Sequence, residues 1–222
     1  MSDKLHRKIK SYVLRPGRIT ESQRKAIETL MPLYGVKKIN KRIDLQKEFK
    51  NNFPIFINIG FGDGEEIVNL STQNSEINYI GIEVHSPGVG RLLSSIDRLK
   101  IKNIRIIKAD ALEVVRDMIS DASIEGVNIF FPDPWPKKKH HKRRIIQKKF
   151  VGEIFRILKN EGKFYICTDW NHYASHIENV MSEFEFFKKI TKLSYRPDTK
   201  FERRGIRLGH KIINFEYKKY FT

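Results

Sequence analysis

The first expected strand of the chain and the turn after it read Pro54-Ile55-Phe56-Ile57-Asn58-Ile59-Gly60-Phe61-Gly62-Asp63-Gly64. The apolar run up to Ile59 predicts a buried strand. The three glycines predict a tight turn, because a residue without a Cβ lets the backbone bend sharply and approach a ligand closely. A glycine turn is weak evidence for a nucleotide site by itself, so the rest of the chain has to support it.

Strands and helices alternate along the chain. The expected strands are 54–59, 78–83, 103–107, 126–131, 162–168, 185–193 and 211–219, and the expected helices are 20–31, 65–70, 87–100, 111–119, 145–158 and 173–184. This alternation predicts an α/β fold, with a mostly parallel seven-stranded sheet and helices on both of its faces.

The length of 222 residues suits one α/β domain with appended arms. Cys167 is the only cysteine, so no intrachain disulfide and no Cys-based zinc site is expected. His172 and His176 have metal-capable i, i+4 spacing, but no further ligand cluster accompanies them, and no metal is expected. The sequence shows no membrane span and no signal peptide, so we expect a cytoplasmic protein. A monomer is favoured, although no motif decides the oligomeric state.

The net charge of +17 is unevenly distributed. Residues 1–50 carry 14 Lys or Arg and 5 Asp or Glu, residues 51–110 carry 6 and 7, and residues 111–222 carry 23 and 14. Basic surface on both sides of a near-neutral block is typical of a nucleic-acid binder. Membrane-surface binding is the competing interpretation, and it is weaker because the basic residues do not follow one amphipathic helix.

Polar features stand at the ends of five successive expected strands. They are the glycine turn, Glu83, Asp110, Asp133 and Asp169. In open parallel sheets, ligands bind at the carboxyl ends of the strands. The sequence therefore predicts a ligand site at this edge of the sheet.

The turn Gly60-x-Gly62-x-Gly64 differs from the dinucleotide spacing G-x-G-x-x-G. The acidic residues around it argue against a pyrophosphate and favour a cofactor that bears a cationic sulfonium and an amino acid. Asn58, inside the strand, either bonds the turn or touches this cofactor, and the sequence leaves both open.

Two acidic residues are candidates for the nucleoside part of a cofactor. Glu83 follows Gly64 by 19 residues and can accept both hydrogen bonds of a ribose diol; the competing role is a helix cap or a surface residue. Asp110 can accept from an adenine amino group, or it caps the helix that begins at Ala111.

The stretch after the fourth strand reads Phe130-Phe131-Pro132-Asp133-Pro134-Trp135-Pro136-Lys137-Lys138-Lys139-His140-His141-Lys142-Arg143-Arg144. The prolines predict a stiff loop. One carboxylate, one aromatic face and many phosphate-binding groups suit an enzyme that places a nucleobase in a pocket while it holds the backbone. The competing interpretation is a solvated basic loop with a packed tryptophan. Residues 199–205 also combine polar, aromatic and basic groups, but the residues alone slightly favour a surface loop there.

These motifs together resemble the bacterial tRNA (guanine-N7-)-methyltransferase family. The similarity covers about residues 12–218. It rests on Ile59-Gly60-Phe61-Gly62-x-Gly64, Gly81 to Gly90, Phe130 to Trp135, Lys142-Arg143-Arg144, Thr168-Asp169-Trp170, Thr199 to His210, and Arg15-x-Gly17-Arg18. The resemblance implies a Rossmann-like class I methyltransferase fold with an antiparallel last strand. It also implies a basic N-terminal arm and helix over 1–52 and a methyltransferase domain over 53–222.

The resemblance implies that S-adenosylmethionine is the cofactor and that tRNA is the partner, methylated at N7 of guanine 46 in its variable loop. The catalytic residue would be Asp133. The cofactor would contact Asn58, Gly60, Gly62, Gly64, Glu83, Asp110 and Asp133. The tRNA would contact Lys137, Asp169, Thr199, Lys200, Phe201 and Glu202. The sequence departs from the family at Asn58, where an acidic residue is usual.

Three other classes of protein compete with this interpretation. A nicotinamide oxidoreductase is disfavoured by the glycine spacing. A non-catalytic RNA-binding protein would not need Glu83, Asp110 and Asp133 together. A methyltransferase of the same fold that acts on another nucleic acid or on a protein is the main alternative.

Overall fold

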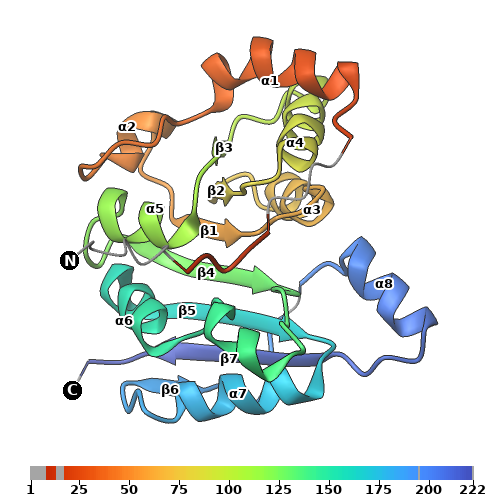
Figure 1. The fold of residues 1–222 in the computed structure, drawn as a ribbon. Coiled ribbons are helices and arrows are strands. Elements are labelled where there is room, and N and C mark those ends of the chain that lie inside the picture. The colour runs from red at the N-terminus through yellow and green to blue at the C-terminus, as the bar shows by residue number, and fades with distance from the viewer. Residues whose placement is uncertain (1–8, 14–17, 195, 222) are drawn as a thin grey trace, which may run out of the picture.

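The computed structural model describes residues 9–13, 18–194 and 196–221 (Figure 1). Its centre is a seven-stranded sheet in the order β3-β2-β1-β4-β5-β7-β6. The strands are β1 Ile55–Ile59, β2 Asn78–Ile82, β3 Ile104–Ile107, β4 Ile124–Phe130, β5 Leu158–Thr168, β6 Phe187–Lys189 and β7 Ile213–Lys219. Strands β1 to β5 are parallel, and β7 lies antiparallel between β5 and β6. The expected fold class is confirmed.

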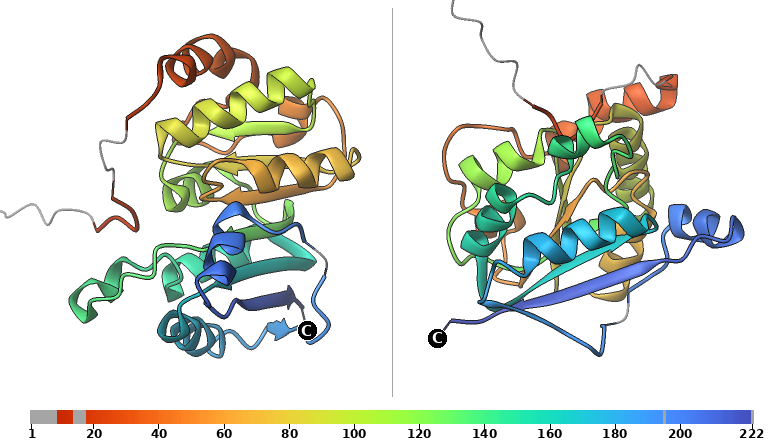
Figure 2. Two further views of the ribbon diagram at one scale, coloured as in Figure 1. Left: turned by 90° about the vertical axis from the view of Figure 1, so that its right-hand side faces the viewer. Right: turned by 60° about the horizontal axis from the view of Figure 1, so that its bottom comes forward.

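Helices cover both faces of this sheet (Figures 1 and 2). They are α1 Glu21–Tyr34, α2 Leu45–Phe49, α3 Glu65–Gln73, α4 Ser86–Leu99, α5 Ala111–Met118, α6 Lys148–Ile157, α7 Asn171–Met181 and α8 Lys200–Arg207, with a 3-10 turn η1 at Lys138–Arg143. Helices α1, α3 and α4 pack into one apolar cluster, and α2, α5, α6 and α7 pack into the other. Each cluster excludes water from one face, which stabilises the layered arrangement.

Several boundaries differ from the expectation. Strand β5 begins at Leu158 rather than at 162, because Leu158 already pairs with Ile124 ahead of a register shift. Helix α6 begins at Lys148, later than expected, and β6 is shorter than 185–193. The expectation of a surface loop at 199–205 is wrong, since α8 begins at Lys200. The Arg15-x-Gly17-Arg18 motif lies mostly outside the described residues, and the domain boundary at 52 stays a prediction.

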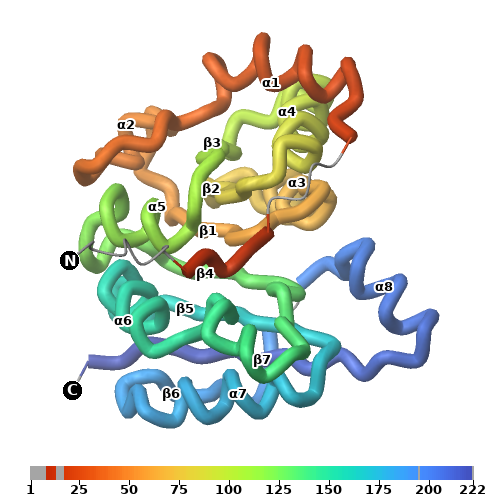
Figure 3. The backbone as a smooth tube through the Cα atoms, in the orientation of Figure 1, coloured from red at the N-terminus to blue at the C-terminus, as the bar shows by residue number. Residues whose placement is uncertain are grey.

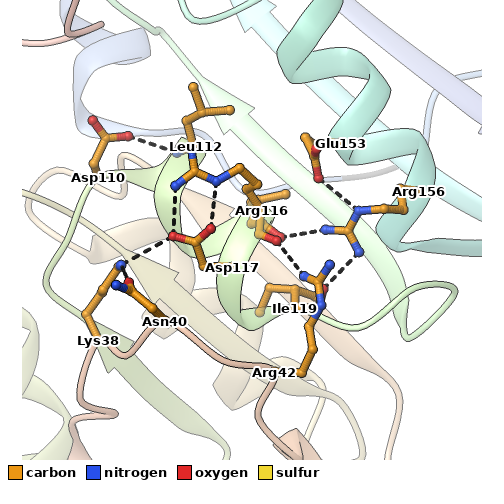
Figure 4. Close-up of polar contacts among 11 residues, drawn as sticks. Lys38, Asn40, Arg42, Asp110, Leu112, Arg116, Asp117, Ile119, Glu153 and Arg156 are labelled. Atoms are coloured by element: carbon orange, nitrogen blue, oxygen red, sulfur yellow. Dashed lines mark hydrogen bonds and ion pairs between the residues drawn. The ribbon is translucent and has the colours of Figure 1, made fainter. Parts of the chain in front are cut away.

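A polar network at the end of α5 joins it to α6 and to the segment between α1 and α2 (Figure 4). Asp117 accepts from Arg116 at 2.6 and 2.9 Å and from Lys38 at 3.3 Å. These cations hold the pKa of Asp117 down to about 2, with the Arg116 hydrogen bonds as the largest cause. Arg42 and Arg156 both donate to the carbonyl of Ile119, which closes the end of the helix.

The carboxyl ends of β1, β4 and β5 point toward α8, which lies at that edge of the sheet (Figures 1 and 3). The glycine turn after β1 and the loop after β4 therefore share one edge with α8. Within the described part of the chain, no helix is long and apolar enough to cross a membrane.

Candidate active site

The glycine turn after β1 has the conformation that the sequence predicts. Gly60, Gly62 and Gly64 have φ angles of 69°, 59° and 80°. An L-residue with a side chain rarely adopts this left-handed region, so each position favours glycine. No atom lies within 4 Å of a Cβ built at Gly60 or Gly62, so the turn leaves open space beside its backbone.

Glu83, at the end of β2, holds this turn. Its Oε2 accepts from the amide of Gly62 at 3.1 Å, and its Oε1 accepts from the amides of Val84 and His85 at 2.6 and 3.0 Å. The residue is only 7% exposed. These three bonds occupy about three of the four acceptor sites of the carboxylate, so one site on Oε2 remains for a ribose hydroxyl.

Glu83 lines cavity B, a hollow of about 190 Å³ at the ends of β1, β2 and β4. Cavity B is also lined by Tyr12, His85, Ala109, Ala111 and Asp133. Asp110 lies between two of these residues but lines a separate hollow of about 180 Å³. Its Oδ1 accepts from the amide of Leu112 at 2.9 Å, so the predicted helix-capping role is confirmed (Figure 4). A contact of Asp110 with a cofactor stays a prediction.

Asp133 lies in a loop whose backbone is hydrogen-bonded to the rest of the protein before and after this residue. The amide of Phe131 donates to the carbonyl of Cys167 at 2.9 Å, and Arg144 Nε donates to the carbonyl of Pro134 at 2.9 Å. Phe131 and Trp135 have positive φ angles of 51° and 47°, which cost about 1–3 kcal/mol each. The surrounding contacts hold this strained loop, so the backbone that carries the exposed Asp133 has a fixed position.

The arm segment 9–13 lies against the same loop. The indole Nε1 of Trp135 donates to the carbonyl of Ser11 at 3.1 Å. Arg143 donates to the carbonyls of Lys10 and Tyr12 at 3.0 and 3.1 Å, and its guanidinium lies 4.0 Å from the centre of the Trp135 ring. Since Ser11 and Tyr12 line cavity B, the arm forms part of its wall.

The basic run from 137 to 144 divides into two groups, so only some of its phosphate-binding groups are free. Arg144 is 2% exposed, donates to His172 Nδ1 at 3.1 Å and lies over the Tyr173 ring. Arg143 is bonded to carbonyls of the arm segment 9–13. The lysines Lys137, Lys138, Lys139 and Lys142 are exposed, and they remain available to an anionic partner.

Cavity A, with a volume of about 410 Å³, lies between the glycine turn, the end of β4 and α8. It is lined among others by Asn58, Glu66, Asn128, Phe131, Phe201 and Arg204. Cavities A and B share lining residues Ile59, Gly60, Phe130 and Phe131, so they adjoin each other across the ends of β1 and β4.

Helix α8 forms one wall of cavity A. The Thr199 hydroxyl accepts from the amide of Glu202 at 2.9 Å, and the Glu202 carboxylate accepts from the amide of Thr199, which completes a capping box. Glu202 is buried and forms a two-pronged ion pair with Arg196 at 2.6 and 2.9 Å. The exposed ring of Phe201 lies 5.1 Å from that of Phe131.

The predicted substrate residues therefore differ in availability. Thr199, Lys200 and Phe201 line cavity A. The Glu202 carboxylate is occupied by Arg196 and the helix cap, and Asp169, after β5, bonds His210 at 2.8 Å. Contact of these residues and of the exposed Lys137 with a substrate stays a prediction.

Sequence reasoning missed Glu66, a buried residue in the first turn of α3. Asn58 Nδ2 donates to Glu66 Oε2 at 2.9 Å, while Glu66 Oε1 is buried without a partner among the described residues. Asn128 in turn faces the Asn58 amide oxygen at 3.5 Å. Burial raises the pKa of Glu66 to about 7, although the Asn58 hydrogen bond and the more distant Arg196 oppose this rise.

Comparisons with known proteins bear on this site. A sequence model of the family described as "Putative methyltransferase" matches residues 52–215. A tRNA (guanine-N(7)-)-methyltransferase of Nitrosospira multiformis is 42% identical over 219 residues, which is 96% of each chain.

Two solved structures share the fold. The 16S rRNA methyltransferase KamB has a TM-score of 0.58 at 10% identity, over 82% of this chain and 96% of that one. A methyltransferase structure from Streptococcus mutans, in complex with SAH, has a TM-score of 0.53 at 14% identity, over 82% and 99%. At these identities the likeness shows the fold alone.

The raised pKa of Glu66 predicts a pH-dependent stability. Between pH 4.5 and about 7 the folded state keeps a proton that the unfolded state has lost, so the free energy of unfolding falls as pH rises through this window. The expected loss is on the order of 3 kcal/mol. Glu66→Gln should remove this part of the slope, as urea unfolding of both proteins from pH 4.5 to 8 will test. Parallel stability curves would contradict it.

Proposed function

Since the chain belongs to the tRNA (guanine-N(7)-)-methyltransferase family, we propose that it transfers a methyl group from S-adenosylmethionine to N7 of a guanine in tRNA. By the resemblance of its motifs, this guanine is number 46 in the variable loop. The products are 7-methylguanosine in the tRNA and S-adenosylhomocysteine. Such a protein works in the cytoplasm, where tRNA is modified.

The residues of the two cavities fit this cofactor. Glu83, already fixed by three backbone amides, keeps an acceptor site on Oε2 for a hydroxyl of the ribose in cavity B. Gly60 lines both cavities, so the amino-acid part of the cofactor can extend from cavity B into cavity A. When bound, the cofactor supplies an electrophilic methyl group.

The single observation that carries the proposal is the fixed position of Asp133. Its carboxylate is exposed, lines cavity B and follows Phe131, which lines both cavities. No described residue bonds it, so it is free to bond a substrate. A carboxylate held there can accept from N1–H and the amino group of a guanine, and the rings of Phe131 and Phe201 offer faces on which the base can stack.

Methyl transfer to guanine N7 depends more on the positioning of the two reacting groups than on proton transfer. Guanine N7 has a lone pair and no proton, so no general base is needed. Orientation of the two reacting groups can supply about 7–11 kcal/mol of the barrier. The purine becomes cationic during transfer, and Asp133, held before the substrate arrives, stabilises that charge electrostatically.

The RNA backbone would lie across two basic surfaces beside the cavities. One consists of the exposed lysines Lys138, Lys139 and Lys142 of η1. The other is the face of α8 at cavity A, with Lys200, Arg204 and Arg207. These cations can pair with phosphates of a folded RNA, which proteins recognise largely by shape.

Incubation of the protein with methyl-labelled S-adenosylmethionine and an unmodified tRNA transcript should give labelled 7-methylguanosine. A transcript with adenine in place of guanine 46 should stay unlabelled, since the expected acceptor is missing. Nucleoside analysis after complete digestion is the measurement. Label in another nucleoside, or in protein or DNA offered alongside, would instead support the alternative acceptor.

Substitution of Asp133 should lower turnover and keep cofactor binding. Asp133→Ala should reduce the single-turnover rate about 100- to 1000-fold, as expected for loss of one preorganised electrostatic partner. Asp133→Asn should lose less, because an amide still accepts one hydrogen bond. Glu185→Gln, another exposed acid, serves as the control. The single-turnover rate should not rise steeply between pH 6 and 9. A steep rise in the wild type that Asp133→Ala abolishes would show that Asp133 abstracts a proton.

Neutralising the η1 lysines should weaken the salt dependence of tRNA binding. The triple change of Lys138, Lys139 and Lys142 to Gln should lower the log–log slope by up to about 2–3, since each lost phosphate contact removes about 0.7–0.9. The matched control neutralises three exposed lysines near α2, namely Lys37, Lys41 and Lys50. Equal slopes for the two triple variants would place the RNA elsewhere.

A further inference from the structure

Cavity A contains a carboxylate that the proposed reaction leaves without a role. We propose, resting on the proposed function, that Glu66 binds the ammonium group of the methionine part of S-adenosylmethionine. It would thereby replace the acidic side chain that the resemblance leads one to expect at the position of Asn58. The acidic group of the cofactor site would thus have moved from β1 to the first turn of α3.

The first support is the direct bond between these two residues. Asn58 Nδ2 donates to Glu66 Oε2 at 2.9 Å, and both residues line cavity A. The amide at position 58 therefore orients a carboxylate beside it, where an acid at position 58 would repel a second acid. Asn128, on the neighbouring strand β4, faces the other side of the Asn58 amide at 3.5 Å.

The second support is the missing partner of Glu66. Two buried glutamates, Glu66 and Glu202, lie near one cation, Arg196. Arg196 makes its short contacts with Glu202, at 2.6 and 2.9 Å, and acts on Glu66 only through the longer-range charge interaction. Glu66 Oε1 is buried and bonds no described residue. A buried carboxylate without a cation is unfavourable in its ionised form, so a cationic ligand is the partner that would satisfy it.

The chemistry of the cofactor selects the ammonium group. An ammonium offers three N–H donors and a full charge, and charge-assisted hydrogen bonds to carboxylates are strong. The sulfonium has a charge but no N–H, so it cannot satisfy Oε1. A guanine edge has N–H donors without the charge, and binding measured in the absence of RNA separates it from the cofactor.

Binding of the ammonium should also release a proton. Glu66, with a pKa raised to about 7 by burial, is largely protonated below that pH and must ionise to pair with a cation. The other titratable groups that act on it, Tyr79 on β2 and Cys167 on β5, have pKa values raised to about 12 by burial and stay neutral. The remaining charged groups of cavity A are Asp63, Lys200, Arg204 and Arg207.

The test compares two ligands by calorimetry without RNA. S-adenosylhomocysteine keeps the ammonium and lacks the sulfonium, whereas methylthioadenosine lacks both. At pH 8, Glu66→Gln should weaken S-adenosylhomocysteine binding about tenfold to a hundredfold, the value of one charge-assisted hydrogen bond, and leave methylthioadenosine binding unchanged. At pH 6, S-adenosylhomocysteine binding in buffers of different ionisation enthalpy should release a proton in the wild type and not in the variant.

Two further variants complete the design. Glu65→Gln removes a charge from the same turn of α3, where Glu65 pairs with Arg203 at 2.7 Å and does not line cavity A, so it should bind both ligands like the wild type. The double variant Asn58→Glu with Glu66→Gln returns the acid to β1 and should regain most of the lost affinity. Unchanged methylthioadenosine binding by Glu66→Gln shows that the single variant is folded.

The outcomes separate this proposal from the proposed function. Equal weakening of both ligands by Glu66→Gln would overturn the ammonium role and leave a structural one. Unchanged S-adenosylhomocysteine affinity would overturn it as well, even if 7-methylguanosine forms. If the ligand pattern appears as expected while the label goes to another acceptor, the ammonium site stands and the tRNA assignment fails.

Discussion

The carboxylate of Glu83 joins the ends of two strands, and both cavities depend on this junction. It accepts from Gly62 in the turn after β1 and from two amides after β2, so the two backbones cannot move apart without breaking these hydrogen bonds. The start of α4 packs on the same turn, because a Cβ at Gly88 would lie 2.0 Å from the carbonyl oxygen of Gly62. The glycines at 62 and 88 thus belong to one packed unit beside cavity A.

Much of the fold was predictable because its signals are local. Apolar runs and turn residues identify the strands, and alternation with helices identifies the sheet. The errors fall where tertiary contacts decide. Strand β5 extends to Leu158 because Ile124 is there to pair with it, which no local pattern shows. Helix α8 was missed although Thr199 and Glu202 have capping-box spacing. Glu66 looks like an exposed residue of α3, and only the folded structure shows that it faces a cavity.

Charge counted along the chain overstates the charge that an RNA can meet. Arg143 and Arg144 stand in the basic run, yet their planar guanidinium groups donate to backbone carbonyls and lie over the rings of Trp135 and Tyr173. They hold the loop that carries Asp133. The neighbouring lysines, whose ammonium groups are strongly hydrated, stay in solvent. In this short basic run the arginines therefore stabilise the loop, and the lysines are left to bind an anionic partner.

Glu66, Glu83 and Glu202 are buried at this edge of the sheet, and their carboxylates differ in their hydrogen-bond and charge partners. Glu83 is satisfied by backbone amides, and Glu202 by Arg196 and a helix cap. Both partners are fixed once the chain has folded, so these two carboxylates contribute rigidity. Glu66 has one amide donor from Asn58 and an oxygen without a described partner. Because desolvation is unfavourable for an unpaired charge, this is the position where a ligand changes the electrostatic balance most. The fold thus gives Glu83 and Glu202 partners on both carboxylate oxygens and leaves Oε1 of Glu66 without a described one inside the cavity.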